Sequence, residues 1–113
     1  MSQLASQLQA MMAKAYRERM AIQRLQLSRG LTIRVYVDDD QSIHLMISRP
    51  ETYPSIAEWK AVLMALPKVF DQSPDPEQVW GKKTRALTAI IPTVRPDPFN
   101  QLAQASQSER TQP

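Results

Sequence analysis

The stretch of residues 31–66 constrains the fold most, because two alternating runs and one helical run follow each other within it. Residues 31–37 and 42–48 each carry an aliphatic side chain at every second position, which is typical of a β-strand with one buried face. A short polar turn separates the runs, so the pattern predicts an antiparallel hairpin. Only an odd loop of three or five residues places all the aliphatic side chains on one face, and we expect that loop within residues 37–41.

A helix is expected directly after the hairpin. Pro50 ends the second strand, and Ser55 with Glu58 three residues later forms the capping-box pattern of a helix N-terminus. The inward stripe of this helix is predicted to contain Ile56, Trp59, Leu63 and Leu66, with Val62 beside it. Trp59 is expected to lie over the aliphatic face of the hairpin, at the centre of the core.

Residues 2–28 are rich in alanine, glutamine, leucine, methionine and arginine and contain no glycine or proline. This composition predicts one long basic amphipathic helix within residues 1–30, with Gly30 as its stop. Two apolar ridges run along it, the first with Leu4, Leu8, Met11, Ala15, Ile22 and Leu25, the second with Met12, Tyr16, Met20 and Leu27.

The combined apolar arc of this helix is wider than a small sheet can cover. We therefore predict that Met12, Tyr16 and Met20 bind a protein partner or a second copy of the chain. The alternative is that one end of the helix packs on the core and the rest is an apolar surface. A membrane-surface helix is disfavoured, since alanine and glutamine replace the usual bulky anchors.

Residues 67–91 complete the predicted domain. Residues 68–81 contain two prolines and three acidic residues and are interpreted as a connector lying along the surface. Residues 82–91 alternate and favour a third strand that pairs with the hairpin edge, with a helix as the competing interpretation. The sequence thus predicts a single small α+β domain, residues 1–91, in the order α-β-β-α-β, built from segments 1–30, 31–66 and 67–91.

Residues 92–113 are rich in proline, glutamine and serine, and this composition predicts a flexible C-terminal tail. Phe99 and Leu102 interrupt the polar composition at helical spacing. We interpret them as a short motif that binds a partner, with a frayed chain end as the alternative.

Charge is segregated along the chain. Residues 1–37 carry six basic groups and one acidic group, residues 38–78 eight acidic and three basic groups, and residues 79–113 five basic and two acidic groups. Opposite blocks of this kind favour association with a partner or with another copy. We therefore predict a non-enzymatic protein-protein interaction module or adaptor subunit of a larger assembly. The alternative is a nucleic-acid-binding accessory protein that contacts phosphates through Lys14, Arg17, Arg24, Lys82, Lys83 and Arg85.

Several functional classes are disfavoured by what the sequence lacks. It contains no cysteine and a single histidine, His44, so it offers no recognisable constellation for catalysis, and no cofactor or small-molecule substrate is indicated. Asp38, Asp39 and Asp40 are better explained as turn formers than as metal ligands, since no calcium-loop spacing follows. The N-terminus has no continuous apolar run, so we expect neither a secretory signal nor a membrane span, and a cytoplasmic location.

Overall fold

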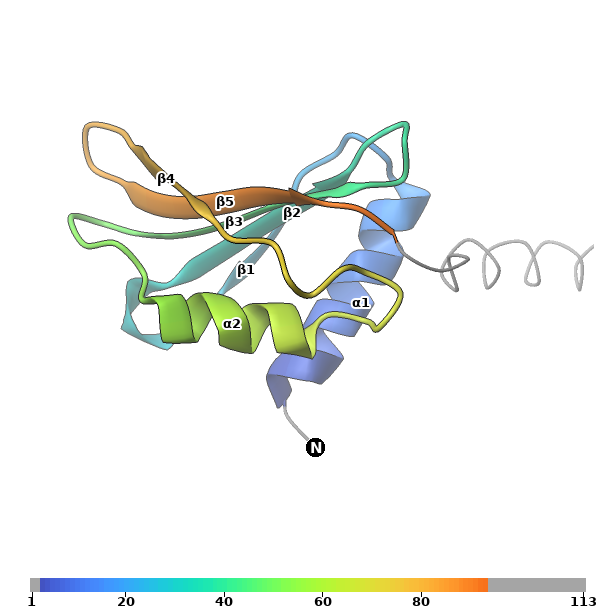
Figure 1. Ribbon diagram of the computed structural model, residues 1–113, viewed down its shortest axis with the longest axis horizontal. Helices are drawn as coiled ribbons and strands as arrows, with labels where there is room; N and C mark the ends of the chain where they lie inside the picture. The colour runs from blue at the N-terminus through green and yellow to red at the C-terminus, as the bar shows by residue number, and fades with distance from the viewer. Residues whose placement is uncertain (1–2, 94–113) are drawn as a thin grey trace, which may run out of the picture.

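The computed structural model describes residues 3–93, in which two helices lie against an antiparallel sheet of five strands (Figure 1). The elements follow the chain as α1 (Gln3–Arg17), β1 (Gln23–Gln26), a 3-10 turn (Ser28–Gly30), β2 (Thr32–Val37), β3 (Ile43–Arg49), α2 (Ile56–Ala65), β4 (Glu77–Trp80) and β5 (Arg85–Ile91). Across the sheet the strand order is β1-β2-β3-β5-β4. The predicted α+β class is confirmed.

The hairpin has the predicted register. Val35 lies opposite Leu45, so the aliphatic residues of both strands share one face. The loop between β2 and β3 has an odd length and spans residues 38–42, one residue later than predicted. The carboxylate of Asp38 shapes this loop by accepting hydrogen bonds from the backbone N–H groups of Asp40 (2.9 Å) and Ser42 (3.1 Å).

The third strand is also confirmed, because β5 pairs with β3 at the hairpin edge and places Ala89 opposite Leu45. The sheet continues further than the sequence indicated. The predicted connector of residues 68–81 contains β4, which pairs with the other side of β5 and brings Trp80 opposite Arg85. Strand β4 is therefore one edge of the sheet, and β1 is the other.

The prediction of one helix over residues 2–28 is wrong beyond Arg17. Met20 adopts a left-handed backbone conformation with φ of 69°, which turns the chain back toward the sheet. Its N–H donates to the carbonyl oxygen of Val37 at 2.9 Å. The following residues form β1 and pair with β2, with Leu25 opposite Ile33. Strand β1 thus satisfies the backbone N–H and C=O groups at the edge of β2. A continuation of α1 could not have made these hydrogen bonds.

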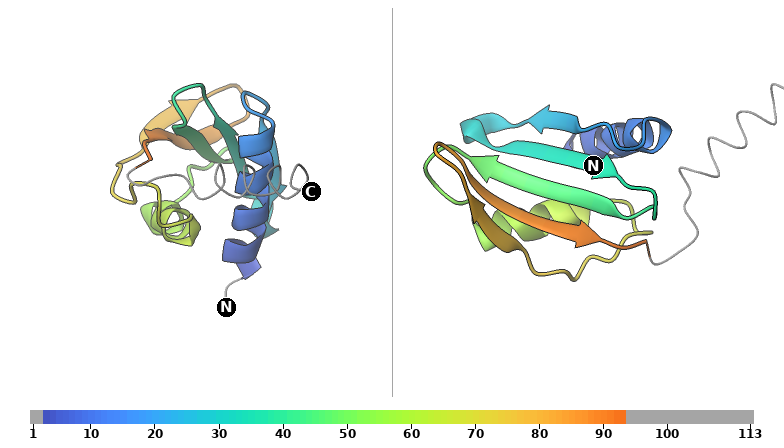
Figure 2. Two further views of the ribbon diagram at one scale, coloured as in Figure 1. Left: turned by 90° about the vertical axis from the view of Figure 1, so that its right-hand side faces the viewer. Right: turned by 90° about the horizontal axis from the view of Figure 1, so that it is seen from above.

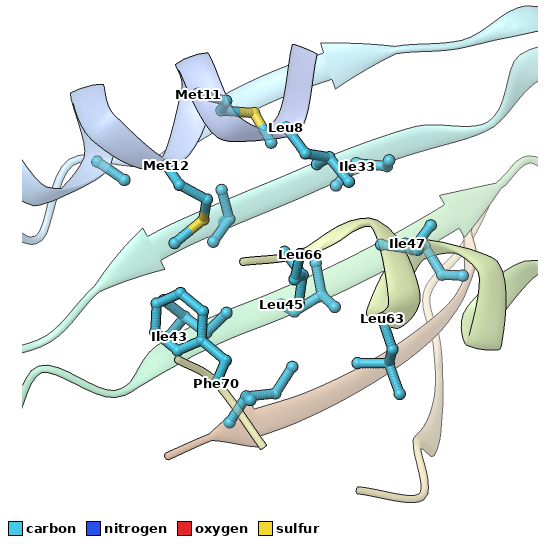
Figure 3. Packing of buried hydrophobic residues seen from close by; sticks show 14 of the residues in the cluster. Leu8, Met11, Met12, Ile33, Ile43, Leu45, Ile47, Leu63, Leu66 and Phe70 are labelled. Atoms are coloured by element: carbon cyan, nitrogen blue, oxygen red, sulfur yellow. The ribbon is translucent and has the colours of Figure 1, made fainter. Parts of the chain in front are cut away.

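The core lies between the sheet and the helices, which both cover the same face of the sheet (Figures 1 and 2). Figure 3 shows side chains of α1, α2 and the strands meeting there. Fully buried large side chains include Leu8, Met12, Ile33, Ile43, Leu45, Ile47, Trp59, Phe70, Leu87 and Ile91. Trp59 occupies the predicted central position, and its indole N–H donates to the carbonyl oxygen of Pro74 at 3.1 Å. Ile56 was predicted to face inward but is 53% exposed in the first turn of α2.

The predicted capping box at the start of α2 is confirmed. The Ser55 hydroxyl accepts the backbone N–H of Glu58 at 3.1 Å, and the Glu58 carboxylate accepts the backbone N–H of Ser55 at 2.8 Å. The same carboxylate receives two hydrogen bonds from the guanidinium of Arg49 at the end of β3. This ion pair with Arg49 lowers the pKa of Glu58 to about 2, and the capping bonds from Ser55 act in the same direction.

The Glu58 carboxylate makes the stability of the fold sensitive to acid. Its pKa is depressed from 4.5 in the unfolded chain to about 2 in the folded one, so its stabilising effect is complete above about pH 4.5 and disappears as the pH falls towards 2. Because the pair is partly exposed, we expect a loss of about 1–2 kcal/mol in the free energy of unfolding. Urea denaturation between pH 7 and pH 2.5 measures this loss. Glu58→Gln should remove the part of the pH dependence that comes from the Glu58 carboxylate. An unchanged pH profile in Glu58→Gln would contradict this assignment.

Candidate interaction face of the sheet

The face of the sheet opposite the helices is left uncovered, and we call it the open face. Figure 2 (right) looks onto it, with α2 behind the strands. Alternate residues of each strand project to this side, and the strand register arranges them in rows across the sheet. The central row, which we call the charged row, consists of Arg24, Arg34, Met46, Thr88 and Glu77.

Large apolar side chains remain accessible on and around the open face. Ile22, just before β1, is 62% exposed, and Ile90 on β5 is 60% exposed. The half-buried side chains of Tyr36 and Met46 line a hollow of about 200 Å³ together with Ile22, and Ile90 lines a neighbouring hollow. An aliphatic side chain left this accessible forfeits the free energy it would gain by burial, so an apolar patch of this kind is typical of a contact surface.

The polar part of the open face is a cluster of Tyr36, His44 and Asp38. The rings of Tyr36 and His44 stack with centroids 4.3 Å apart, and the Tyr36 hydroxyl lies 3.0 Å from His44 Nδ1. His44 Nε2 lies 2.7 Å from a carboxylate oxygen of Asp38. The hydrogen bond with His44 lowers the pKa of Asp38, and the backbone N–H groups of Ser42 and Asp40 lower it further.

This cluster places an acid, an imidazole and a hydroxyl in hydrogen-bonded sequence. The same order of groups can activate a hydroxyl nucleophile, because the acid orients the base that removes its proton. Here the Asp38 carboxylate also accepts the loop N–H groups, and the Tyr36 and His44 rings cover each other. The contacts therefore fit a clamp that fixes the hairpin loop and the local shape of the open face.

The two sides of the open face differ in charge. On one side, Arg24 of the edge strand lies directly opposite Arg34, whose guanidinium donates to the Ser48 hydroxyl at 3.0 Å. On the other side, the exposed Glu77 of β4 lies opposite Thr88. Within residues 3–93, neither Arg24 nor Glu77 makes a side-chain hydrogen bond or an ion pair. One side is basic and the other acidic, and both end residues are available to a partner.

A second exposed feature lies at the turn between β4 and β5. Trp80 is 72% exposed at the end of the edge strand, and Lys82 and Lys83 are exposed in the turn that follows. Arg85 closes this turn by donating from Nη1 to the carbonyl oxygens of Gly81 (3.0 Å) and Thr84 (3.1 Å). An accessible indole beside lysines can contact either an acidic protein or a nucleic acid.

The residues predicted to bind a partner do not form one surface. Met12 is fully buried and Tyr16 is 7% exposed, because the helix ridge to which they belong packs into the domain's own core. Tyr16 stacks on Phe70 there, with ring centroids 6.2 Å apart. Only Met20 is accessible, with 57% of its surface exposed. Phe99 and Leu102 lie outside the described residues.

The basic residues predicted to contact phosphates are also separated. Lys14 and Arg17 belong to the last turn of α1, close to the start of β3, and Lys14 lies 4.0 Å from Glu18. Lys82, Lys83 and Arg85 lie near the opposite end of β3, about 20 Å away along the strands. Arg24 projects from the open face. The structure does not gather these side chains into one phosphate-contacting surface.

Sequence reasoning missed the open face as a site. It assigned Ile22 to a buried helix ridge. The available signals were Met46 and Ile90, two apolar residues at outward positions of β3 and β5 where the alternation predicts polar ones. Within residues 3–93, no group of three or more His, Asp or Glu side chains is placed to hold a metal ion. No helix in this part of the chain is long and apolar enough to span a membrane.

Comparison with protein-family models, with curated proteins and with solved structures finds no match to this chain.

Proposed function

We propose that this chain is a non-enzymatic protein-protein interaction module that binds a folded protein through the open face of its sheet. The observation that carries the proposal is the exposure of two large aliphatic side chains on the uncovered side, Ile22 and Ile90, each of which lines a hollow there. Burial of such side chains is the main favourable contribution in most protein association.

The form of the open face supports a folded partner. The face is flanked by charges of both signs, which orient an approaching surface and discourage a misaligned one. The Tyr36–His44 stack and the Asp38 loop clamp hold the hairpin-loop end of the face in one conformation, so little ordering is required there on binding. We place the module in the cytoplasm, as the sequence predicts.

Site-specific photo-crosslinking tests this proposal in the cells from which the chain comes. A photoreactive residue at position 90 should crosslink to a protein, identified by mass spectrometry, because Ile90 would lie inside the contact. Position 64 is the matched control, since Met64 is equally apolar and 68% exposed but lies on α2, behind the sheet. Equal crosslinking from positions 90 and 64, or none from position 90, would contradict the proposal.

Nucleic-acid binding stays the second candidate and now rests on the β4–β5 turn. The favouring observation is the exposed Trp80 beside Lys82 and Lys83, since an indole can stack on a base while lysines contact phosphates. The acidic Glu77 in the same short strand opposes it. The same photoreactive residue at position 80 would support this candidate by crosslinking to RNA or DNA in place of protein.

A further inference from the structure

We propose that the protein bound by the open face is a second copy of this chain, in a dimer whose two-fold axis runs parallel to β3, just outside the open face. This inference rests on the proposed function and names the partner. Two sheets packed face to face about such an axis exchange their sides, so β1 of one copy lies over β4 of the other and β2 lies over β5.

The strand register makes the charged row complementary to itself under this rotation. Arg24 and Glu77 stand at the two ends of one row, two strands away from Met46 on either side. The axis therefore brings Arg24 of each copy opposite Glu77 of the other and Met46 opposite Met46. Both ion pairs form at once, because an isologous interface repeats every contact.

The isolated chain leaves this row electrostatically unsatisfied. Arg24 lies directly across from Arg34, and like charges in that position repel. Within residues 3–93, Glu77 at the far end has no ion-pair partner. A purely acidic partner would satisfy the arginines and repel Glu77, and a purely basic one would do the reverse. A surface with both signs at this spacing satisfies both ends, and the chain itself presents one.

The neighbouring row supports the same arrangement. Tyr36 on β2 and Ile90 on β5 are equidistant from His44 on the central strand. The rotation places the Tyr36 ring over Ile90 of the second copy, twice, and covers the most exposed aliphatic side chain of β5. A specific interface usually has aromatic and aliphatic side chains at its centre and charges at its rim.

The size of the face sets the expected strength. Five strands spaced about 4.8 Å apart make the face roughly 20 Å wide. Six steps along a strand, each of about 3.3 Å per residue, make it roughly 20 Å long. Such a contact lies at the small end of specific interfaces, so we expect reversible dimerisation with a dissociation constant of about 1–100 μM.

Charge reversal tests the register of the dimer in the full chain. Arg24→Glu and Glu77→Arg each turn both attractive pairs into repulsive ones, so each variant should dimerise at least about tenfold more weakly by analytical ultracentrifugation. An equimolar mixture of the two should dimerise like the wild type, because both glutamates of one variant then face the arginines of the other. The double variant should recover wild-type dimerisation as well.

Lys60→Glu on α2 is the matched control. It reverses an exposed charge away from the open face and should leave association unchanged.

Other outcomes would each contradict one part of the proposal: the dimer, its register or the contact face. A wild-type chain that stays monomeric at about 200 μM, above the whole range expected for the dissociation constant, would overturn the proposed dimer. Charge variants that dimerise normally would overturn its register. If Ile90→Lys abolished a dimer that both charge reversals left intact, the open face would stand and only the register would fail. A monomeric chain whose position 90 crosslinks to a different protein would keep the proposed function and overturn the self-association. A dimer lost only in Trp80→Ser would associate through the edge of β4. That result would contradict both the proposed dimer and the open face as the contact surface.

Discussion

Trp59→Ala should lower the free energy of unfolding by about 3–5 kcal/mol, because it removes a large aromatic side chain from a packed interior. Trp59 is 1% exposed and lies between α2 and the sheet. Its indole N–H also satisfies the carbonyl oxygen of Pro74, which ties the chain before β4 to the helix. The substitution therefore leaves a cavity and also an acceptor without its donor.

The chain offers its own control, since its other tryptophan is exposed. Trp80→Ala removes the same side chain from a position with 72% exposure and should change the stability by about 0.5 kcal/mol or less. Urea denaturation followed by circular dichroism measures both variants without relying on tryptophan fluorescence. Similar losses in the two variants would mean that Trp59 is not the centre of the core.

The parts of the fold that the sequence predicted correctly are encoded locally. The hairpin register follows from strict alternation, because any other loop parity would mix the aliphatic and polar faces. The start of α2 follows from Ser55 and Glu58, whose side chains satisfy each other's backbone N–H groups. In both cases the residues that carry the signal also make the contact.

The end of α1 could not be predicted in the same way. Residues 18–28 contain no glycine or proline, and the left-handed turn is made by Met20, which has a side chain that disfavours it. What stabilises the turn lies far along the chain, where the Val37 carbonyl accepts the Met20 N–H. Pairing of β1 with β2 thus overrides a helical composition. Gly30 marked a real boundary, but of the turn between two strands, where it adopts φ of 75°.

The open face was hidden for a related reason. Alternation shows that β2 and β3 each have an apolar and a polar side, but it does not show that α1 and α2 pack on the same one. Strand β4 was hidden as well, because Glu77, Gln78, Val79 and Trp80 are all exposed and do not alternate in burial. Its position beyond β5 brings Glu77 into the row of Arg24, a juxtaposition that depends on the whole strand order.

Met12→Glu should abolish folding or lower the free energy of unfolding by more than about 4 kcal/mol, while Met20→Glu should leave the fold intact. Both methionines belong to the helix ridge that the sequence assigned to a partner. Met12 is fully buried against the sheet, so a carboxylate there would be desolvated without a counter-ion, whereas Met20 is 57% exposed beyond the end of α1. Thermal unfolding followed by circular dichroism distinguishes the two. A stable Met12→Glu chain that had lost only its association would return the ridge to the contact surface. Loss of folding in Met12→Glu alone would show that the ridge is core and would leave the open face as the proposed contact surface.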